Sequence, residues 1–223
     1  MARVVSAPLR KNGKREKNKR DKILRIKKAA AELFSLEGFD AATTEQIARR
    51  ANVAKGTLFL YARDKRDLVF LIFNDEIAKI SQKAFAQADP SDPLLDQLVS
   101  VASGFYKGFL KNPQLSKILL AELFFYRGKL AKDFYEDRQR VIEAYQQLLS
   151  RAQSSGKLAA DIDAAVAAKH FFILISGALR IWLGEENPKL SQGLAQVREI
   201  LSLSVRNMDS RIGTVEAVTN KAS

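Results

Sequence analysis

The chain has 223 residues, enough for two helical domains with cores of their own. It contains no cysteine, which excludes a disulfide scaffold or a thiolate zinc site and fits a reducing compartment. The net charge of +12 is concentrated at one end, because residues 1–28 hold twelve Lys or Arg against Glu16 and Asp21. A nearly neutral body with a basic end predicts contact with a polyanion, although such a tail can also serve solubility alone.

The hydrophobic segments are too short to cross a membrane. The most apolar one, residues 171–179, is bounded by His170 and Arg180, and a spanning helix needs about 20 apolar residues. The basic N-terminus also lacks the apolar segment of a secretory signal. We therefore expect a soluble cytoplasmic protein with no membrane partner.

The first ordered element is expected after a basic tail. Residues 1–18 are rich in Lys, Arg and Asn without apolar periodicity, which predicts disorder. From about Lys19, apolar residues recur at the three- and four-residue spacing of a helix. Gly38 then offers a suitable C-terminal cap, and Phe39 is expected to pack back into a small core.

The next stretch, residues 43–65 (TTEQIARRANVAKGTLFLYARDK), predicts two short helices joined by a tight turn. Thr43 can cap the first helix, with Gln46 completing a capping box. Asn52 stands at the turn and tolerates a left-handed conformation. The second helix is expected from about Lys55 to Tyr61. Two short helices joined in this way describe a helix-turn-helix.

A helix-turn-helix reads DNA with the N-terminal end of its second helix in the major groove. Lys55 can donate hydrogen bonds to guanine O6 and N7, and Thr57 can contact a base edge or a thymine methyl group. Thr44 lies in the first turn of the first helix, where free N–H groups and the helix dipole favour a phosphate. These residue types predict a double-stranded DNA partner.

The same region resembles the TetR family of bacterial transcriptional regulators. The matching positions are Ile23, the run Ala29-Ala30-Ala31-Glu32-Leu33-Phe34, Gly38-Phe39, Leu58-Phe59-Leu60-Tyr61, Lys65 and Leu68. Asn52 stands where the family most often has Gly, and Phe59 where it most often has Tyr. The resemblance implies phosphate contacts by Tyr61 and Lys65. The DNA-binding candidates are Thr44, Lys55, Gly56, Thr57, Phe59, Tyr61 and Lys65.

The remaining chain predicts further helices and no strand of useful length. They are expected at about 64–87, 94–111, 114–127, 130–154, 163–183 and 190–207, separated by Pro-, Gly- and Ser-containing breaks. We expect an all-α protein with a DNA-binding domain at 19–66 and a helical ligand-binding and dimerisation domain at 67–210. A loose tail, residues 211–223, is expected to follow.

Aromatic residues are concentrated in the middle helices. Each can be ordinary core, but as a group they can also line an apolar cavity. The family resemblance implies a small-molecule effector in this region, and such a lining predicts an apolar or aromatic one. The candidates are Phe105, Phe109, Phe124, Phe125, Tyr126, Phe134 and Tyr135.

The last two predicted helices are candidates for a homodimer interface. Residues 171–175 are apolar all round, and 190, 194, 197 and 201 form a near-heptad seam. A four-helix interface between two copies is favoured, as the resemblance implies, over a monomeric core. The candidates are Phe171, Leu174, Ala178, Leu194, Val197 and Leu201. His170 fits a satisfied core or interface residue better than a ligand or proton sensor.

Catalytic patterns are missing from the sequence: it has no Cys nucleophile, Gly-rich phosphate loop, HExxH or Glu-x-x-His pair. We expect no enzyme activity, catalytic residue, metal or cofactor.

The favoured function is a dimeric repressor released from a palindromic operator by an apolar effector. The alternative is a helical architectural protein that coats nucleic acid without sequence preference. In the first case, the helix at 64–87 is expected to be the only continuous link from cavity to DNA.

Overall fold

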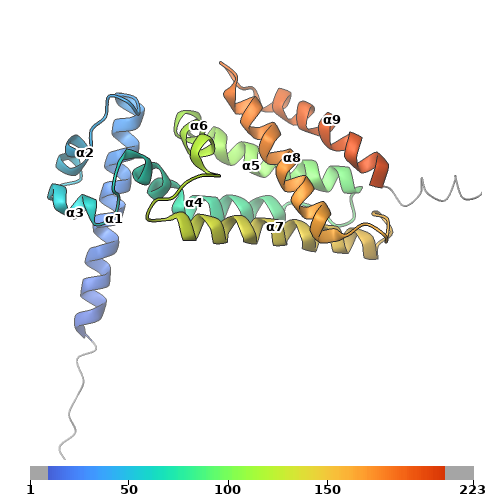
Figure 1. Ribbon diagram of the computed structural model, residues 1–223, viewed down its shortest axis with the longest axis horizontal. Helices are drawn as coiled ribbons and strands as arrows, with labels where there is room; N and C mark the ends of the chain where they lie inside the picture. The colour runs from blue at the N-terminus through green and yellow to red at the C-terminus, as the bar shows by residue number, and fades with distance from the viewer. Residues whose placement is uncertain (1–9, 209–223) are drawn as a thin grey trace, which may run out of the picture. The chain divides into compact units, whose positions relative to one another are not determined.

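The computed structural model describes residues 10–208, and within that range it contains nine α-helices and no strand (Figure 1). The expected all-α class is confirmed. The helices are α1 (Arg10–Leu36), α2 (Thr44–Arg50), α3 (Lys55–Phe59), α4 (Lys65–Ala86), α5 (Leu94–Leu110), α6 (Pro113–Glu122), α7 (Ala131–Ser154), α8 (Ala164–Gly184) and α9 (Leu190–Met208).

The chain divides into two compact units. The first unit extends to Phe73 and also includes Arg127–Leu130; the second comprises Asn74–Tyr126 and the chain from Ala131 onward. The expected boundary at residues 66/67 therefore falls inside α4, a few residues before the observed one. The expected tail at 211–223 lies outside the described residues.

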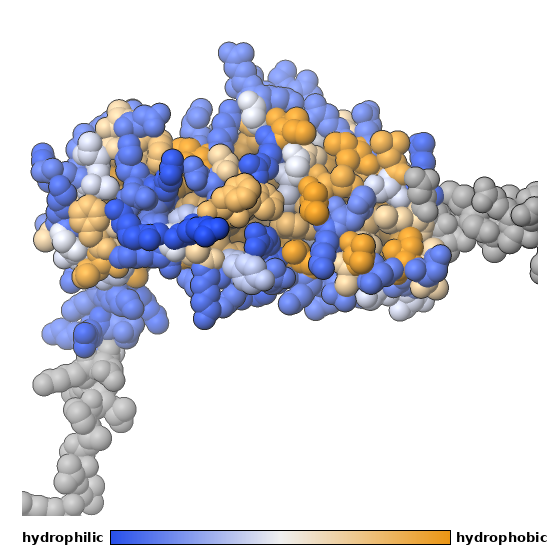
Figure 2. Space-filling view, in the orientation of Figure 1, coloured by the Kyte–Doolittle hydropathy of each residue, from blue (hydrophilic) through white to orange (hydrophobic). Residues whose placement is uncertain are grey.

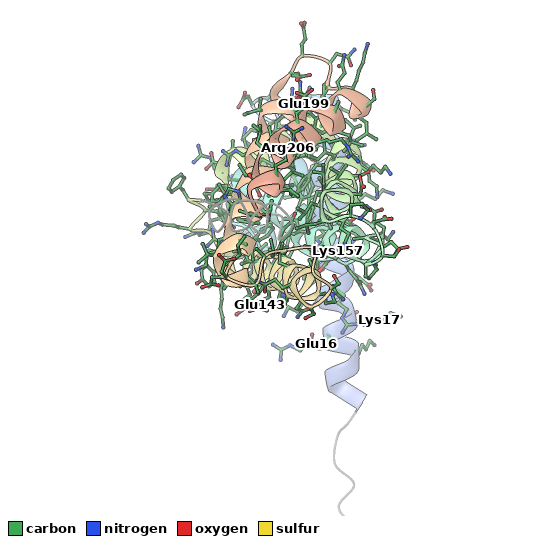
Figure 3. All side chains as sticks on the ribbon, turned by 90° about the vertical axis from the view of Figure 1, so that its right-hand side faces the viewer. Glu16, Lys17, Glu143, Lys157, Glu199 and Arg206 are labelled. Carbon is green, nitrogen blue, oxygen red and sulfur yellow. The ribbon has the colours of Figure 1, made fainter. Side chains whose placement is uncertain are left out.

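Helix α1 begins at Arg10, so residues 10–18 are helical where the sequence predicted disorder; residues 1–9 lie outside the described part. Lys, Arg and Glu are good helix formers, which accounts for the continuation of the helix. Residues 13–22 are exposed on every side; Glu16 and Lys17 mark this part of α1 in Figure 3. The helix has no apolar stripe there, and its hydrophobic face begins near Ile26.

Helices α1, α2 and α3 each contribute at least one residue to the small core of the first unit. Ile26, Ile47 and Leu58 are fully buried. Gly38 follows α1 with φ +85°, as expected for a C-terminal cap. The ring centroids of Phe34 and Phe39 are 5.2 Å apart, so the chain packs back against α1 directly after this turn.

The second unit is a bundle in which α5 packs on α9, α7 on α8, and α8 on α9 (Figure 1). Helices α4 and α5 approach closely at Gly104, because a Cβ atom there would lie 2.5 Å from the Cα of Ala84. Lys157, labelled in Figure 3, holds the loop before α5 by donating to the carbonyl oxygens of Ser91 and Asp92, each at 2.8 Å.

By length and composition alone, helix α8 is long and apolar enough to cross a membrane. The sequence instead predicted that every hydrophobic segment is too short to do so. Within the bundle it packs against α7 and α9. Phe171 and Ile175 are buried among its neighbours, whereas Ile173 and Ile181 are 63% and 73% exposed. Its outer face is therefore an apolar surface on the single chain.

Candidate nucleic-acid interface and effector cavity

The helix-turn-helix is built as its sequence predicts. The Thr43 hydroxyl accepts a hydrogen bond from the backbone N–H of Gln46 (3.2 Å), and the Thr43 N–H donates to Gln46 Oε1 (2.8 Å). This reciprocal capping box starts α2. Asn52 occupies the turn with φ 51°, the left-handed conformation that Asn tolerates.

Helix α3 is held by one buried anchor, Leu58, which leaves its other side chains at the surface. Lys55, Gly56 and Phe59 are exposed, whereas Thr57 and Tyr61 are half-buried. Among the described residues, no atom outside the adjacent residues and the backbone of α3 lies within 4 Å of a Cβ built on Gly56, so the backbone is open to a close approach there. The Lys55 ammonium lies 3.7 Å from the carboxylate of Glu45, an exposed pair that a nucleic acid can displace.

Lys65, predicted as a phosphate contact, also has a structural task. Its ammonium group donates to the carbonyl oxygens of Phe39 and Asp40, both at 2.8 Å, and lies 5.0 Å from the centroid of the Phe39 ring. These contacts hold the connection between α1 and α2. Thr44, the other predicted phosphate contact, is half-buried at the first residue of α2.

A buried carboxylate that the sequence did not reveal closes the turn between α3 and α4. Asp67 is 1% exposed and accepts hydrogen bonds from the backbone N–H (2.8 Å) and Nε (3.3 Å) of Arg63. Its own N–H donates to Asp64, the residue before α4. The i,i+4 spacing of Arg63 and Asp67 is the sequence signal for this pair.

Residues 127–130, the second half of the connection from α6 to α7, belong to the first unit. The Arg63 guanidinium donates through Nη2 to the carbonyl oxygen of Arg127 at 2.7 Å. Lys129 Nζ donates to the carbonyl oxygen of Phe59, the last residue of α3. Helix α4 is therefore not the only continuous element that joins the two units, which corrects the expectation from the sequence. Helix α6 ends at Glu122 rather than at about Arg127, which makes this connection long.

The second unit encloses a cavity of about 340 Å³. Most of the predicted aromatic candidates line it, but Phe125 does not and is 85% exposed. Further lining comes from Arg138, Val141 and Tyr145, which follow Phe134 at three- and four-residue spacing on α7 and could have been found from that spacing. The predicted candidates that line the cavity are Phe105, Phe109, Phe124, Tyr126, Phe134 and Tyr135.

Two arginines give the mainly apolar cavity a positive charge. Arg138 lies over the ring of Tyr135 (5.0 Å) and Arg180 over that of Phe124 (5.3 Å). Within residues 10–208 neither guanidinium group pairs with a carboxylate. The one acidic residue in the lining, Asp137, forms an ion pair with Arg140. The cavity therefore presents unneutralised positive charge beside aromatic rings.

Two tyrosines lie side by side in the core next to this cavity. Tyr145 lines the cavity, while Tyr106 is fully buried and stacks on Trp182 with ring centroids 4.6 Å apart. Burial raises the pKa of each tyrosine above its ordinary value, and the charge of Tyr106 adds to the effect on Tyr145. The Tyr106 hydroxyl has no hydrogen-bond partner among the described residues.

The predicted dimer-interface residues divide between core and surface. Phe171, Ala178, Val197 and Leu201 are buried within the single chain, which leaves them little surface for a partner. Leu174 and Leu194 are half-buried. The outer apolar positions of the same helices are Val166, Ile173, Ile181 and Leu203; hydrophobic residues gather where α8 and α9 lie in Figure 2. The near-heptad seam therefore packs α9 into its own bundle.

The single histidine has a local partner. A ring nitrogen of His170 lies 3.0 Å from the Ser204 hydroxyl, which joins α8 to α9. Within residues 10–208 no group of three or more His, Cys, Asp or Glu side chains is arranged to hold a metal ion.

Two family models match the chain. "Bacterial regulatory proteins, tetR family" matches residues 26–72, and "AefR-like transcriptional repressor, C-terminal domain" matches residues 110–201. The Fatty acid metabolism regulator protein of Bacillus subtilis is 22% identical over 167 residues, covering 75% of this chain and 86% of that protein.

Solved structures share the fold. The regulator FadR of Bacillus subtilis, in complex with stearoyl-CoA, gives a TM-score of 0.63 at 20% identity and covers 80% of this chain and 96% of that one. The repressor FadR of Thermus thermophilus, in complex with lauroyl-CoA, gives the same TM-score and identity and covers 80% and 92%.

The helix-turn-helix, the helical second unit and the two family matches define a DNA-binding transcriptional regulator. The chain belongs to the TetR family, and it acts as a repressor.

Proposed function

We propose that this chain is a cytoplasmic, homodimeric repressor that an acyl-coenzyme A thioester releases from a palindromic operator. The observation that carries the ligand class is the cavity itself, in which aromatic rings and the Arg138 and Arg180 guanidinium groups lie together. The Fatty acid metabolism regulator protein and the two FadR complexes with acyl-CoA support the same ligand class.

The charge of the cavity favours an anionic ligand over a neutral hydrocarbon. A guanidinium group removed from water loses hydration, and only an opposite charge with good hydrogen-bond geometry offsets that loss. Arg binds phosphate and carboxylate oxygens through two parallel N–H donors. Arg138 and Arg180 can therefore hold the phosphates of coenzyme A, or the carboxylate of a free acid, while the rings cover the alkyl chain.

The size of the cavity favours a medium-length acyl chain. At about 30 Å³ for each water-sized group, 340 Å³ holds about eleven non-hydrogen atoms. An acyl chain of about eight to ten carbons fills that space without expanding the bundle, and a twelve-carbon chain exceeds it by only about two atoms. Coenzyme A itself is too large for the cavity and would lie at its mouth. We therefore expect octanoyl- and lauroyl-CoA to bind more tightly than stearoyl-CoA.

The second copy is proposed to bind through the outer face of α8 and α9. Val166, Ile173 and Ile181 recur at seven- and eight-residue spacing on α8 and are all exposed, as is Leu203 on α9. Two such faces related by a two-fold axis bury each other, which is the commonest route to a homodimer. Ile173→Glu should give a monomer in size-exclusion chromatography with light scattering, whereas Lys107→Glu, at an exposed site on α5, should remain dimeric.

Binding of four matched ligands tests the ligand class. Calorimetry on the full chain compares four ligands: lauroyl-CoA, laurate, dodecanol and coenzyme A alone. We expect lauroyl-CoA to bind most tightly, laurate and dodecanol more weakly, and coenzyme A alone least. Equal binding of dodecanol and lauroyl-CoA would refute the anionic ligand.

Arginine variants test whether the preference for an anionic ligand depends on the guanidinium groups of the cavity. Arg138→Met and Arg180→Met should each weaken lauroyl-CoA binding by about 10- to 100-fold, the value of one charge-assisted hydrogen bond. Dodecanol binding should not weaken, because it has no anion to lose. Arg151→Met, an exposed change on the same helix as Arg138, is the control for a general loss of positive charge.

A further inference from the structure

The recognition helix α3 is too short to be stable by itself. It has five residues, and isolated helices shorter than about 12 residues are marginal in water. Its last N–H donors follow a tight pattern: Leu60 bonds to the Thr57 carbonyl, and both Tyr61 and Ala62 bond to that of Leu58. The carbonyl oxygen of Phe59 is among the helix-end acceptors that need a partner from elsewhere.

Lys129 supplies that partner from a segment 70 residues away in sequence. Its ammonium group donates to the Phe59 carbonyl oxygen, and a positive charge at a helix C-terminus also interacts favourably with the helix dipole. Two residues earlier, the Arg127 carbonyl oxygen accepts from Arg63, whose Nε also bonds to Asp67. Segment 127–130 is thus bonded to the end of α3 and to the turn that follows it.

We infer that segment 127–130 is a structural part of the DNA-reading unit, in which Lys129 is the positioning residue for α3. We further infer that this segment carries the state of the effector cavity to α3; this second step rests on the proposed function.

The residues on both sides of the segment belong to the cavity wall. Phe124 and Tyr126 precede it, Ala131 and Phe134 follow it, and all four line the cavity. The connection from the end of α6 at Glu122 to the start of α7 at Ala131 has no helix of its own. A ligand that displaces these aromatic residues therefore changes the strain on a short segment that is bonded to the end of α3 and to the turn after it.

Hydrogen exchange of the full chain tests the positioning role without any effector. Lys129→Met removes the donor but keeps the length of the side chain, Lys129→Arg keeps a donor, and Lys132→Met removes an exposed lysine nearby that pairs with Glu136. The amides of Leu60, Tyr61 and Ala62 should exchange about fivefold faster in Lys129→Met, the value of one net hydrogen bond.

Lys129→Arg should restore exchange to near the wild-type rate, and Lys132→Met should not change it. Unchanged exchange in Lys129→Met would overturn the positioning role. Uniformly faster exchange throughout the first unit would also overturn it, because it would indicate general destabilisation.

The coupling is measured with lauroyl-CoA as the probe and DNA selected from a random pool as the operator. In the wild type we expect saturating lauroyl-CoA to weaken operator binding by about 5- to 150-fold. In Lys129→Met this factor should fall by about threefold or more, while lauroyl-CoA binding to the free protein stays unchanged.

The two failures are distinguishable. If lauroyl-CoA does not weaken operator binding by the wild type, it is not the effector, and the coupling step loses its basis. The exchange rates still decide the role of Lys129. A wild-type factor above one that is the same in Lys129→Met would overturn the coupling through this segment.

Discussion

Lys65 and Phe39 are joined twice: the Lys65 ammonium donates to the Phe39 carbonyl oxygen at 2.8 Å and lies 5.0 Å from the centroid of its ring. The same ammonium group also bonds to the Asp40 carbonyl oxygen. One side chain at the first residue of α4 therefore holds the α1–α2 connection while remaining half-exposed.

Lys65→Ala should consequently lower stability as well as DNA affinity. Loss of bonds from a charged donor should reduce the free energy of unfolding by about 1–3 kcal/mol, and binding to all DNA sequences should weaken about equally. Chemical denaturation followed by circular dichroism measures the first effect. Lys83→Ala, at an exposed site near the end of α4, is the control; a changed sequence preference in Lys65→Ala would require a base-reading role.

Lys55→Ala should alter which sequence is bound. The exposed ammonium at the N-terminal residue of α3 pairs with the exposed Glu45 carboxylate at 3.7 Å, a weak surface pair that a guanine can displace. The variant should lose about 1–3 kcal/mol of operator binding and relax preference at one position in each half-site. An unchanged motif after selection from random DNA would exclude this contact.

The basic part of α1 should contribute affinity without sequence choice. Replacing Lys14, Lys17 and Lys19 with Gln should flatten the slope of log affinity against log salt by about 0.9 for each phosphate that the variant no longer neutralises. The selected motif should stay the same. An altered preference for A·T pairs beside the half-sites would instead indicate a minor-groove contact, and an unaltered slope would exclude both roles.

The fold was predictable where local signals agreed with packing. Thr43, Asn52 and Gly38 each have one conformational task, and all three perform it. The start of α1 was not predictable from apolar periodicity, because residues 13–22 of this helix are exposed on every side. The end of α6 was not predictable either, since the apolar residues 123–126 (Leu-Phe-Phe-Tyr) fit a helix by composition but lie beyond its end, where they line the cavity or the surface.

Individual residues of the candidate site could be predicted from the sequence, but the contacts between residues far apart in the chain could not. Aromatic composition identified six of the residues that line the cavity. Arg138 and Arg180, in contrast, resemble ordinary surface residues in sequence, and only the structure shows the rings that they cover. The bond between Lys129 and Phe59 spans 70 residues and leaves no periodic signal. Long-range contacts of this kind depend on tertiary packing, which a single sequence does not display.

The buried tyrosines predict a stability change at high pH. Their pKa values are raised in the folded state, so folded protein binds these protons more tightly than unfolded protein does. Stability should be complete below the ordinary tyrosine pKa of about 10 and fall as the pH rises above it. Denaturant titrations at pH 8 and above should show a smaller fall in Tyr145→Phe than in the wild type.

Tyr106→Phe should not destabilise the protein at neutral pH. Its hydroxyl is buried without a partner among residues 10–208, so its removal relieves a desolvation penalty. We expect a gain of up to about 1 kcal/mol in the free energy of unfolding, measured by urea denaturation. A loss of more than about 1 kcal/mol would show that the hydroxyl has a bonding partner in solution.

The most direct test of the repressor mechanism is the affinity of the full chain for lauroyl-CoA with and without saturating operator DNA. Linkage requires that a ligand which releases the operator binds more weakly to the operator complex, by the same factor that it weakens DNA binding. We predict that factor to be about 5- to 150-fold. Equal affinities in the two titrations would contradict control of DNA binding by the cavity.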